Sequence, residues 1–302
     1  MNRIMVAEPT LGGNERKYVL DCLDTNWISS NGKYIGMLES AFAEFCGSKH
    51  AIACNNGTTS LHLALVAMGL EPGDEVIIPT VTYIATANCV RYCHATPVLV
   101  DVEPGTLNVD PVAIEKAITP KTKGIIPVHL YGYPADMDAI NAIAQRHGLF
   151  VLEDAAEAHG ATIGGRRVGS MGTAASFSFF GNKIVTTSGG GALLSDDTEL
   201  VDHARHLATQ ARQPVPHYEH HHIGFNYRLS NLLAAVGRAQ LSRLPQMMQR
   251  RHEVHAAYRS MLEPSALDAL AAEVLTRWPG RVLRARVLAP GFGRGHSDAR
   301  DF

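Results

Sequence analysis

A lysine lies between an apolar segment and a glycine-rich turn, where it could act as a nucleophile. Residues 176–183 read Ser-Phe-Ser-Phe-Phe-Gly-Asn-Lys, and residues 186–191 read Thr-Thr-Ser-Gly-Gly-Gly. Partial removal from water favours a neutral amine, and a neutral amine at Lys183 can form a Schiff base with a carbonyl compound. Ser178 can offer its hydroxyl to a phosphate. For this segment alone, an exposed lysine at a strand end is an equally good interpretation.

An aspartate follows a second apolar segment, in residues 151–154. Ligands of open α/β sheets bind beyond the carboxyl ends of the strands. Asp154 can therefore pair there with a protonated ring nitrogen, such as that of pyridoxal phosphate. A helix N-cap is the alternative reading of Asp154, and the sequence favours neither. Glu157 and His159 follow closely in the chain.

A third segment, residues 54–60, joins an expected strand to an expected helix and contains Gly57 and Thr58. Free backbone N–H groups at a helix start, together with a threonine hydroxyl, form a natural phosphate site. Tyr83 offers an aromatic ring on which a planar cofactor could stack. Ordinary core packing is the competing interpretation of Tyr83.

The composition excludes several classes of protein. The chain has 302 residues, 46% of them hydrophobic, and a net charge of -2. Neither a basic excess for nucleic-acid binding nor an apolar segment of membrane-spanning length is present, so a small-molecule substrate is expected. Five cysteines without disulfide spacing are typical of a reducing cytoplasm, where we expect the protein. Neither Cys89 with Cys93 nor the histidines at 217 and 220–222 favour a metal site.

Apolar segments and helical patterns alternate through the first two thirds of the chain. This alternation predicts an α/β fold, with a mostly parallel central sheet covered by helices on both faces. The expected strands are residues 51–54, 76–78, 97–100, 123–128, 150–152, 175–179 and 191–194. The expected helices are residues 58–70, 85–92, 137–147 and 246–258.

The composition changes near the end of the sequence. We expect a large cofactor-binding domain over residues 1–240 and a helix over residues 241–264 that leads to a small domain. Residues 265–302 are expected to be an atypical and disordered tail. A short alanine-rich stretch comes first, and residues 277–302 are then rich in arginine, glycine and proline with little periodicity.

Taken together and in this order, the three chemical segments resemble the DegT/StrS family of nucleotide-sugar aminotransferases. Residues 27–33, 128–132 and 224–231 add further matches, and the resemblance covers residues 8–262. It implies a fold type I, aspartate-aminotransferase-like protein with pyridoxal phosphate as its cofactor. Residues 265–302 do not match the small domain of that family, which implies a truncated or atypical C-terminal domain.

The resemblance implies a role for each residue around the cofactor ring. Lys183 would bind the cofactor covalently and later move the proton between substrate and cofactor carbons. Asp154 would pair with the ring nitrogen. Glu157 would lie near the ring hydroxyl, where many relatives have glutamine. Tyr83 would lie on the ring.

The resemblance also implies how the ends of the ligands are held. Gly57, Thr58 and Ser178 would bind the cofactor phosphate. Asn226 would reach the phosphate in a neighbouring subunit, so the active unit would be a homodimer with shared sites. His159 would line the sugar pocket and is a candidate catalytic residue.

The substrates implied by the resemblance are glutamate and a nucleotide-linked 4-keto-6-deoxyhexose used in polysaccharide biosynthesis. Residues 130–137 resemble family members that form GDP-perosamine. Residues 186–191 and 209–220 resemble members that form UDP-linked bacillosamine precursors. Related dehydratases have histidine in place of the lysine, so Lys183 favours amino transfer. The alternative is a truncated, catalytically inactive binding or regulatory protein.

Overall fold

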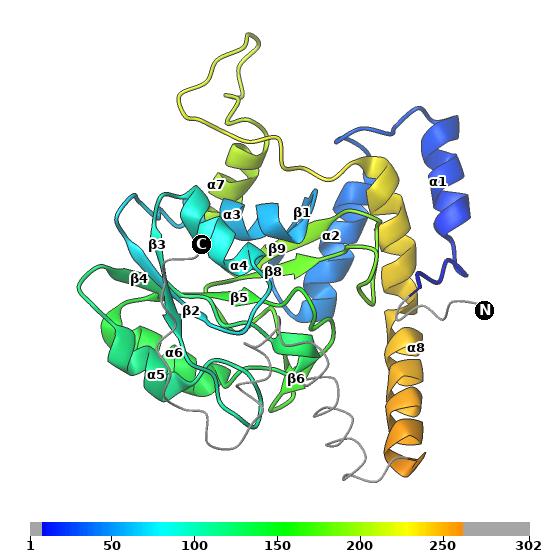
Figure 1. Cartoon of the computed structure of the whole chain (residues 1–302). Helices are drawn as coiled ribbons and strands as arrows, with labels where there is room; N and C mark the ends of the chain where they lie inside the picture. The colour runs from blue at the N-terminus through cyan, green and yellow to red at the C-terminus, as the bar shows by residue number, and fades with distance from the viewer. Residues whose placement is uncertain (1–7, 262–302) are drawn as a thin grey trace, which may run out of the picture.

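The computed structural model of the chain describes residues 8–261 (Figure 1). The predicted tail, residues 265–302, and the last residues of the predicted 241–264 helix lie outside this range. Within residues 8–261, no helix is long and apolar enough to cross a membrane.

A seven-stranded sheet forms the centre of the molecule, in the order β1-β9-β8-β5-β4-β2-β3. The strands β2, β3, β4, β5 and β8 run parallel, and β9 is antiparallel to both of its neighbours. The expected α/β fold with a mostly parallel sheet is therefore confirmed. The strands are β1 His50–Cys54, β2 Glu75–Pro79, β3 Thr96–Val100, β4 Thr122–Ile125, β5 Phe150–Asp154, β8 Ala174–Ser178 and β9 Gly191–Ser195. A separate hairpin contains β6 Thr162–Ile163 and β7 Arg166–Arg167.

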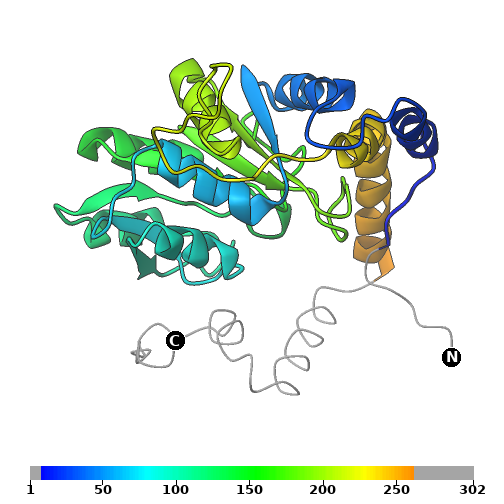
Figure 2. The same ribbon diagram turned by 90° about the horizontal axis from the view of Figure 1, so that it is seen from above.

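Helices cover both faces of this sheet (Figures 1 and 2). One face carries α3 (Gly57–Ala67), α4 (Ala85–Tyr92) and α7 (Thr198–Ala208), and buried Ile52 and Cys54 of β1 point into that core. The opposite face carries α2 (Lys33–Cys46), α5 (Pro111–Ala117) and α6 (Met137–His147), and Ala51 and Ala53 point into the core around α2. This alternation is the period-two pattern of a strand buried on both sides.

The long α8 (Asn231–Met261) packs against α2 at the edge of the sheet, and α1 (Glu15–Asp24) packs against α8 (Figure 2). Helix α8 contains Pro245 and runs without a break past residue 240. The division of the chain at residue 240 therefore falls inside a helix and remains a prediction.

Local sequence explains where the elements begin and end. The Asp136 carboxylate accepts the Ala139 N–H at 3.0 Å and caps α6, and Gly148 ends it in a left-handed conformation with φ 65°. Strand β4 ends at Ile125, short of the predicted residue 128. Pro127 lacks an N–H to donate to a neighbouring strand, which explains the early end.

Candidate active site

A cavity of about 510 Å³ opens at the carboxyl ends of β5 and β8, beside the start of α3. This is the edge at which ligands of open parallel sheets bind. Seven of the predicted site residues line the cavity: Gly57, Thr58, Tyr83, Asp154, Glu157, Ser178 and Lys183. The fold thus brings together residues separated by more than a hundred positions in the chain.

Lys183 is paired within this cavity and is not an open surface lysine. Its Nζ donates to Oε1 of Glu157 at 3.2 Å, and the two side chains are 15% and 34% exposed. The other carboxylate oxygen of Glu157, Oε2, accepts the backbone N–H of Tyr131 at 3.0 Å. The Glu157 carboxylate is therefore held at both oxygens, and the amine of Lys183 has a fixed direction.

Asp154 lies at the end of β5 and is only 6% exposed. Its Oδ2 accepts the Thr86 hydroxyl at 2.7 Å, and its Oδ1 accepts the Ala156 N–H at 3.3 Å. Burial raises the pKa of Asp154, and the hydrogen bond from Thr86 only partly offsets that effect. No helix begins at Asp154, so its interpretation as an N-cap is wrong.

The start of α3 and the end of β8 approach each other closely. A Cβ placed on Gly57 would lie 3.0 Å from the Ser178 Cβ, and one on Gly191 would lie 2.7 Å from the Gly57 nitrogen. The Asn56 side chain accepts the Thr59 N–H at 2.8 Å and so caps the helix. The first N–H groups of a helix have no partner within it, so those of Gly57 and Thr58 suit an anion.

Tyr83 is not a core residue. It is 76% exposed, although it lines the cavity. The exposure removes ordinary core packing as an explanation of this aromatic residue. A ring in this position can cover the open side of a planar ligand.

His159 is placed differently from the other predicted residues. It lies 6% exposed among aromatic rings, with centroids 5.2 Å from Phe177 and 5.8 Å from Phe179. Neither ring nitrogen has a hydrogen-bond partner among the described residues. Burial, with the nearby charge of Lys183, lowers the pKa of His159 to about 3. It lines an adjoining cavity of about 840 Å³, which Lys183 also lines. The imidazole is therefore neutral near pH 7.

Asn226 does not line this cavity. It belongs to the segment between α7 and α8, which projects from the body of the molecule in Figure 1, and it pairs with Thr209 near the start of that segment. Its backbone oxygen accepts the Asn55 side-chain N–H at 3.2 Å. The nearby Arg228 donates to the Ser30 hydroxyl at 3.0 Å. One subunit therefore does not bring Asn226 together with Lys183.

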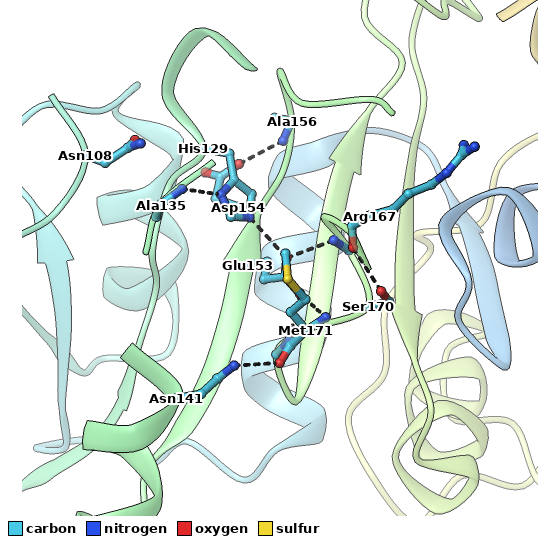
Figure 3. A network of polar contacts seen from close by, with 12 residues as sticks. Asn108, His129, Ala135, Asn141, Glu153, Asp154, Ala156, Arg167, Ser170 and Met171 are labelled. Carbon is cyan, nitrogen blue, oxygen red and sulfur yellow. Dashed lines mark hydrogen bonds and ion pairs between the residues drawn. The ribbon is translucent and has the colours of Figure 1, made fainter. Parts of the chain in front are cut away.

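Sequence reasoning missed a buried polar network behind Asp154, which Figure 3 shows. Glu153 and His129 are joined at 3.1 Å, with both side chains fully buried. Thr86 was also missed. A usable signal was the Glu153–Asp154 dipeptide itself, because successive residues of a strand point to opposite faces. One carboxylate at this edge must then face away from the cavity.

Among residues 8–261, no group of three or more histidine, cysteine or acidic side chains is arranged to hold a metal ion. His217 and His221 in the exposed loop instead contact Glu219, at 2.8 and 2.6 Å.

Comparison with known proteins gives the same family that the sequence motifs resemble. Residues 9–276 match the DegT/DnrJ/EryC1/StrS aminotransferase family. The chain is 56% identical, over 260 residues, to GDP-perosamine synthase of Caulobacter vibrioides. That alignment covers 86% of this chain and 70% of the relative.

Two solved structures have the same fold. DesV of S. venezuelae, solved in complex with a ketimine intermediate, is 41% identical with a TM-score of 0.78; the match covers 82% of this chain and 66% of DesV. The PLP-form of the putative sugar aminotransferase Spr1654 from Streptococcus pneumoniae is 28% identical with a TM-score of 0.81. That match covers 86% of this chain and 71% of Spr1654. The chain thus spans about two thirds of the length of these relatives.

Proposed function

The chain belongs to the DegT/DnrJ/EryC1/StrS aminotransferase family, and we propose that it transfers an amino group from glutamate to a sugar. The acceptor is the 4-keto carbon of a nucleotide-linked 4-keto-6-deoxyhexose, with GDP as the first candidate nucleotide. The 56% identity to a GDP-perosamine synthase supports this choice. A UDP-linked sugar is the second candidate, on the resemblance of residues 186–191 and 209–220.

Pyridoxal phosphate is the cofactor of this family, and when bound it supplies an electron sink for the amino group's carbon. The cavity fits this group. The cavity contains a reactive amine that matches the aldehyde of the cofactor. It also contains a buried carboxylate that matches the ring nitrogen and a helix start that matches the phosphate. Lys183, Asp154 and Gly57 provide these three groups.

Asp154 is the residue that matches the ring nitrogen. Its carboxylate is buried without a cationic partner among the described residues, and burial raises its pKa. A protonated ring nitrogen beside it would remove the cost of burying an unpaired charge. Thr86 fixes the carboxylate by a 2.7 Å hydrogen bond, so the aspartate is oriented before any ligand binds.

Lys183 is the residue that handles the proton. Its Nζ would move a proton between the substrate carbon that carries the amino group and a carbon of the bound cofactor. The 3.2 Å contact with Glu157 directs Nζ into the cavity where the cofactor would bind. That contact, in the cavity that also contains Asp154, is the observation that carries the proposal.

The remaining predicted residues hold the two ends of the ligands. The N–H groups at the start of α3 and the Ser178 hydroxyl would bind the phosphate, and Tyr83 would cover the ring. Asn226 reaches the site of a second copy of the chain, so the active unit is a homodimer.

The test is a panel of GDP- and UDP-linked 4-keto-6-deoxyhexoses incubated with the full chain, cofactor and glutamate. We expect an amino sugar from at least one member of the panel. Absence of product with every sugar would contradict the proposal. Glutamate alone then separates two outcomes: an enzyme loses its yellow colour on amino transfer to the cofactor, whereas a binding protein stays yellow.

A further inference from the structure

A charged carboxylate is buried directly behind the candidate active site (Figure 3). Glu153 is 0% exposed, and its two oxygens accept four hydrogen bonds. Oε2 accepts from His129 at 3.1 Å and from the Gly169 N–H at 2.8 Å. Oε1 accepts from the N–H groups of Met171 and Gly172 at 2.8 and 2.7 Å. Burial alone raises the pKa of Glu153, but these bonds outweigh burial and hold it below its usual range.

The ring of His129 is fixed at both nitrogens. Its Nδ1 accepts the backbone N–H of Ala135 at 3.0 Å, so the ring proton must lie on Nε2 and point to Glu153. Protonation of Nδ1 would place two donors against each other. His129 thus joins the charged Glu153 to both ends of the turn formed by residues 129–135.

This turn is closed from a second side by Asn108, which is 2% exposed. The Asn108 side chain accepts the Leu130 N–H at 3.2 Å and donates to the Tyr133 carbonyl at 3.0 Å. Between these contacts Tyr131 adopts a left-handed conformation, with φ 53° and ψ 24°. This conformation costs a non-glycine residue about 1 kcal/mol, so the surrounding contacts must enforce it.

The left-handed turn has one consequence at the active site. The N–H of Tyr131 donates to Oε2 of Glu157 at 3.0 Å, and Oε1 of the same carboxylate accepts from Lys183 at 3.2 Å. Because the Glu157 side chain is 34% exposed, it would otherwise be free to rotate into water. The Tyr131 N–H is a contact that prevents this rotation.

We propose that Glu153 and His129 are positioning residues: through the 129–135 turn they hold the Tyr131 N–H on Glu157, and so direct Glu157 toward Lys183. This inference rests on the proposed function only in taking Lys183 as the residue that binds the cofactor. Within residues 8–261 no hydrogen bond or ion pair joins Lys183 to Glu153 or His129, although His129 lines the same cavity. The proposed route to Lys183 therefore runs through Glu157, and the test below separates it from a direct effect.

The test is a double-mutant cycle on the full chain loaded with cofactor, with the pH midpoint of the yellow absorbance as the readout. An anionic Glu157 favours the protonated nitrogen at Lys183, so Glu157→Gln should lower this midpoint by about one unit. Glu153→Gln should lower it by part of that amount. The double variant should have the same pH midpoint as Glu157→Gln alone. Without the Glu157 carboxylate, the 129–135 turn has no charged group to direct toward Lys183.

Two results would overturn the inference: an unchanged midpoint in Glu153→Gln, or a shift of equal size with and without Glu157. A purely structural role predicts the second result.

His129→Asn is the alternative variant where Glu153→Gln does not fold, since it leaves Glu153 three backbone donors. Asn141→Ala is the matched control, because Asn141 donates to the Met171 carbonyl at 2.9 Å and not to Glu153. Its midpoint should stay that of the wild type.

A second readout needs no cofactor. In the apoprotein the Tyr131 amide should be protected from hydrogen exchange, and His129→Asn should exchange it at least tenfold faster while Asn141→Ala does not. Equal protection in both variants would count against the inference. Failure of the proposed function is recognised separately, because Lys183→Ala would then remain as yellow as the wild type.

Discussion

The Nζ of Lys183 lies 3.2 Å from Oε1 of Glu157, in the cavity that Asp154 lines from the end of β5. A reactive amine is thus held by one carboxylate while a second, Asp154, is buried with only neutral donors. The two acidic groups have different environments and so different tasks. We propose that Glu157 orients the amine and that Asp154 pairs with a cationic ligand.

Asp154→Asn should weaken cofactor binding by about tenfold to a hundredfold, because it removes the charge that pairs with the ring nitrogen. The same change should stabilise the apoprotein at pH 7. Burial raises the pKa of Asp154 in the folded chain above its value in the unfolded chain. The free energy of unfolding of the wild type therefore falls as the pH rises between these two pKa values, and Asp154→Asn lacks this loss. Absorbance titration measures the first effect and urea unfolding the second. Unchanged cofactor affinity would contradict the assignment.

His159 predicts a pH dependence of stability. Its pKa is about 3 in the folded chain and about 6.5 when unfolded, so the unfolded state binds more protons between these values. Stability should therefore fall as the pH is lowered from 7, by about 2 kcal/mol at pH 5. Urea unfolding of His159→Leu should lack this loss. The control His203→Leu, at an exposed histidine of α7, should retain it, and an identical loss in both variants would refute the prediction.

Gly57→Ala should lower the affinity for cofactor at least tenfold. The added Cβ would lie 3.0 Å from Ser178 and narrow the space between α3 and β8 where the phosphate is expected. Gly36→Ala is the matched control, because its Cβ meets no atom within 4 Å in helix α2. We expect Gly36→Ala to bind cofactor normally and to gain about 0.5–1 kcal/mol of stability. Equal cofactor affinities in the two variants would contradict the hypothesis that the phosphate binds between α3 and β8.

Asn226 predicts complementation between subunits. In a homodimer with shared sites, Asn226→Ala should weaken cofactor binding in the partner and leave its own subunit unaffected. A mixture of Asn226→Ala and Lys183→Ala chains should regain one intact site in each mixed dimer. Cofactor affinity of the mixture, measured after exchange of subunits, reports this. No recovery, with mixed dimers detected by sedimentation, would show that the sites are not shared.

The strand and helix pattern could be predicted from the sequence because the central strands are buried on both faces. Helices 85–92 and 137–147 have the predicted bounds, since the turn residues and Gly148 mark their ends. Strand β4 was predicted too long because the apolar segment continues through Pro127. The pattern of apolar residues does not show that Pro127 lacks a backbone N–H.

The candidate site was predictable in composition and only partly in geometry. Residues at strand ends and at a helix start converge on one edge of a parallel sheet, which places Asp154, Gly57 and Lys183 together. The link from Glu153 through His129 to Tyr131 depends on the left-handed conformation of Tyr131. The residue types in this segment do not predict that conformation. Asn226 does not line the cavity of one subunit, and its role in the site of a second subunit stays a prediction.

The absorbance spectrum of the purified chain with pyridoxal phosphate tests the central claim most directly. If Lys183 holds the cofactor as a Schiff base, as we propose, wild-type protein should be yellow after removal of free cofactor. Lys183→Ala should lack this absorbance, and glutamate should bleach the wild type. Identical spectra for the two proteins would contradict the assignment of Lys183, and with it the proposed aminotransferase.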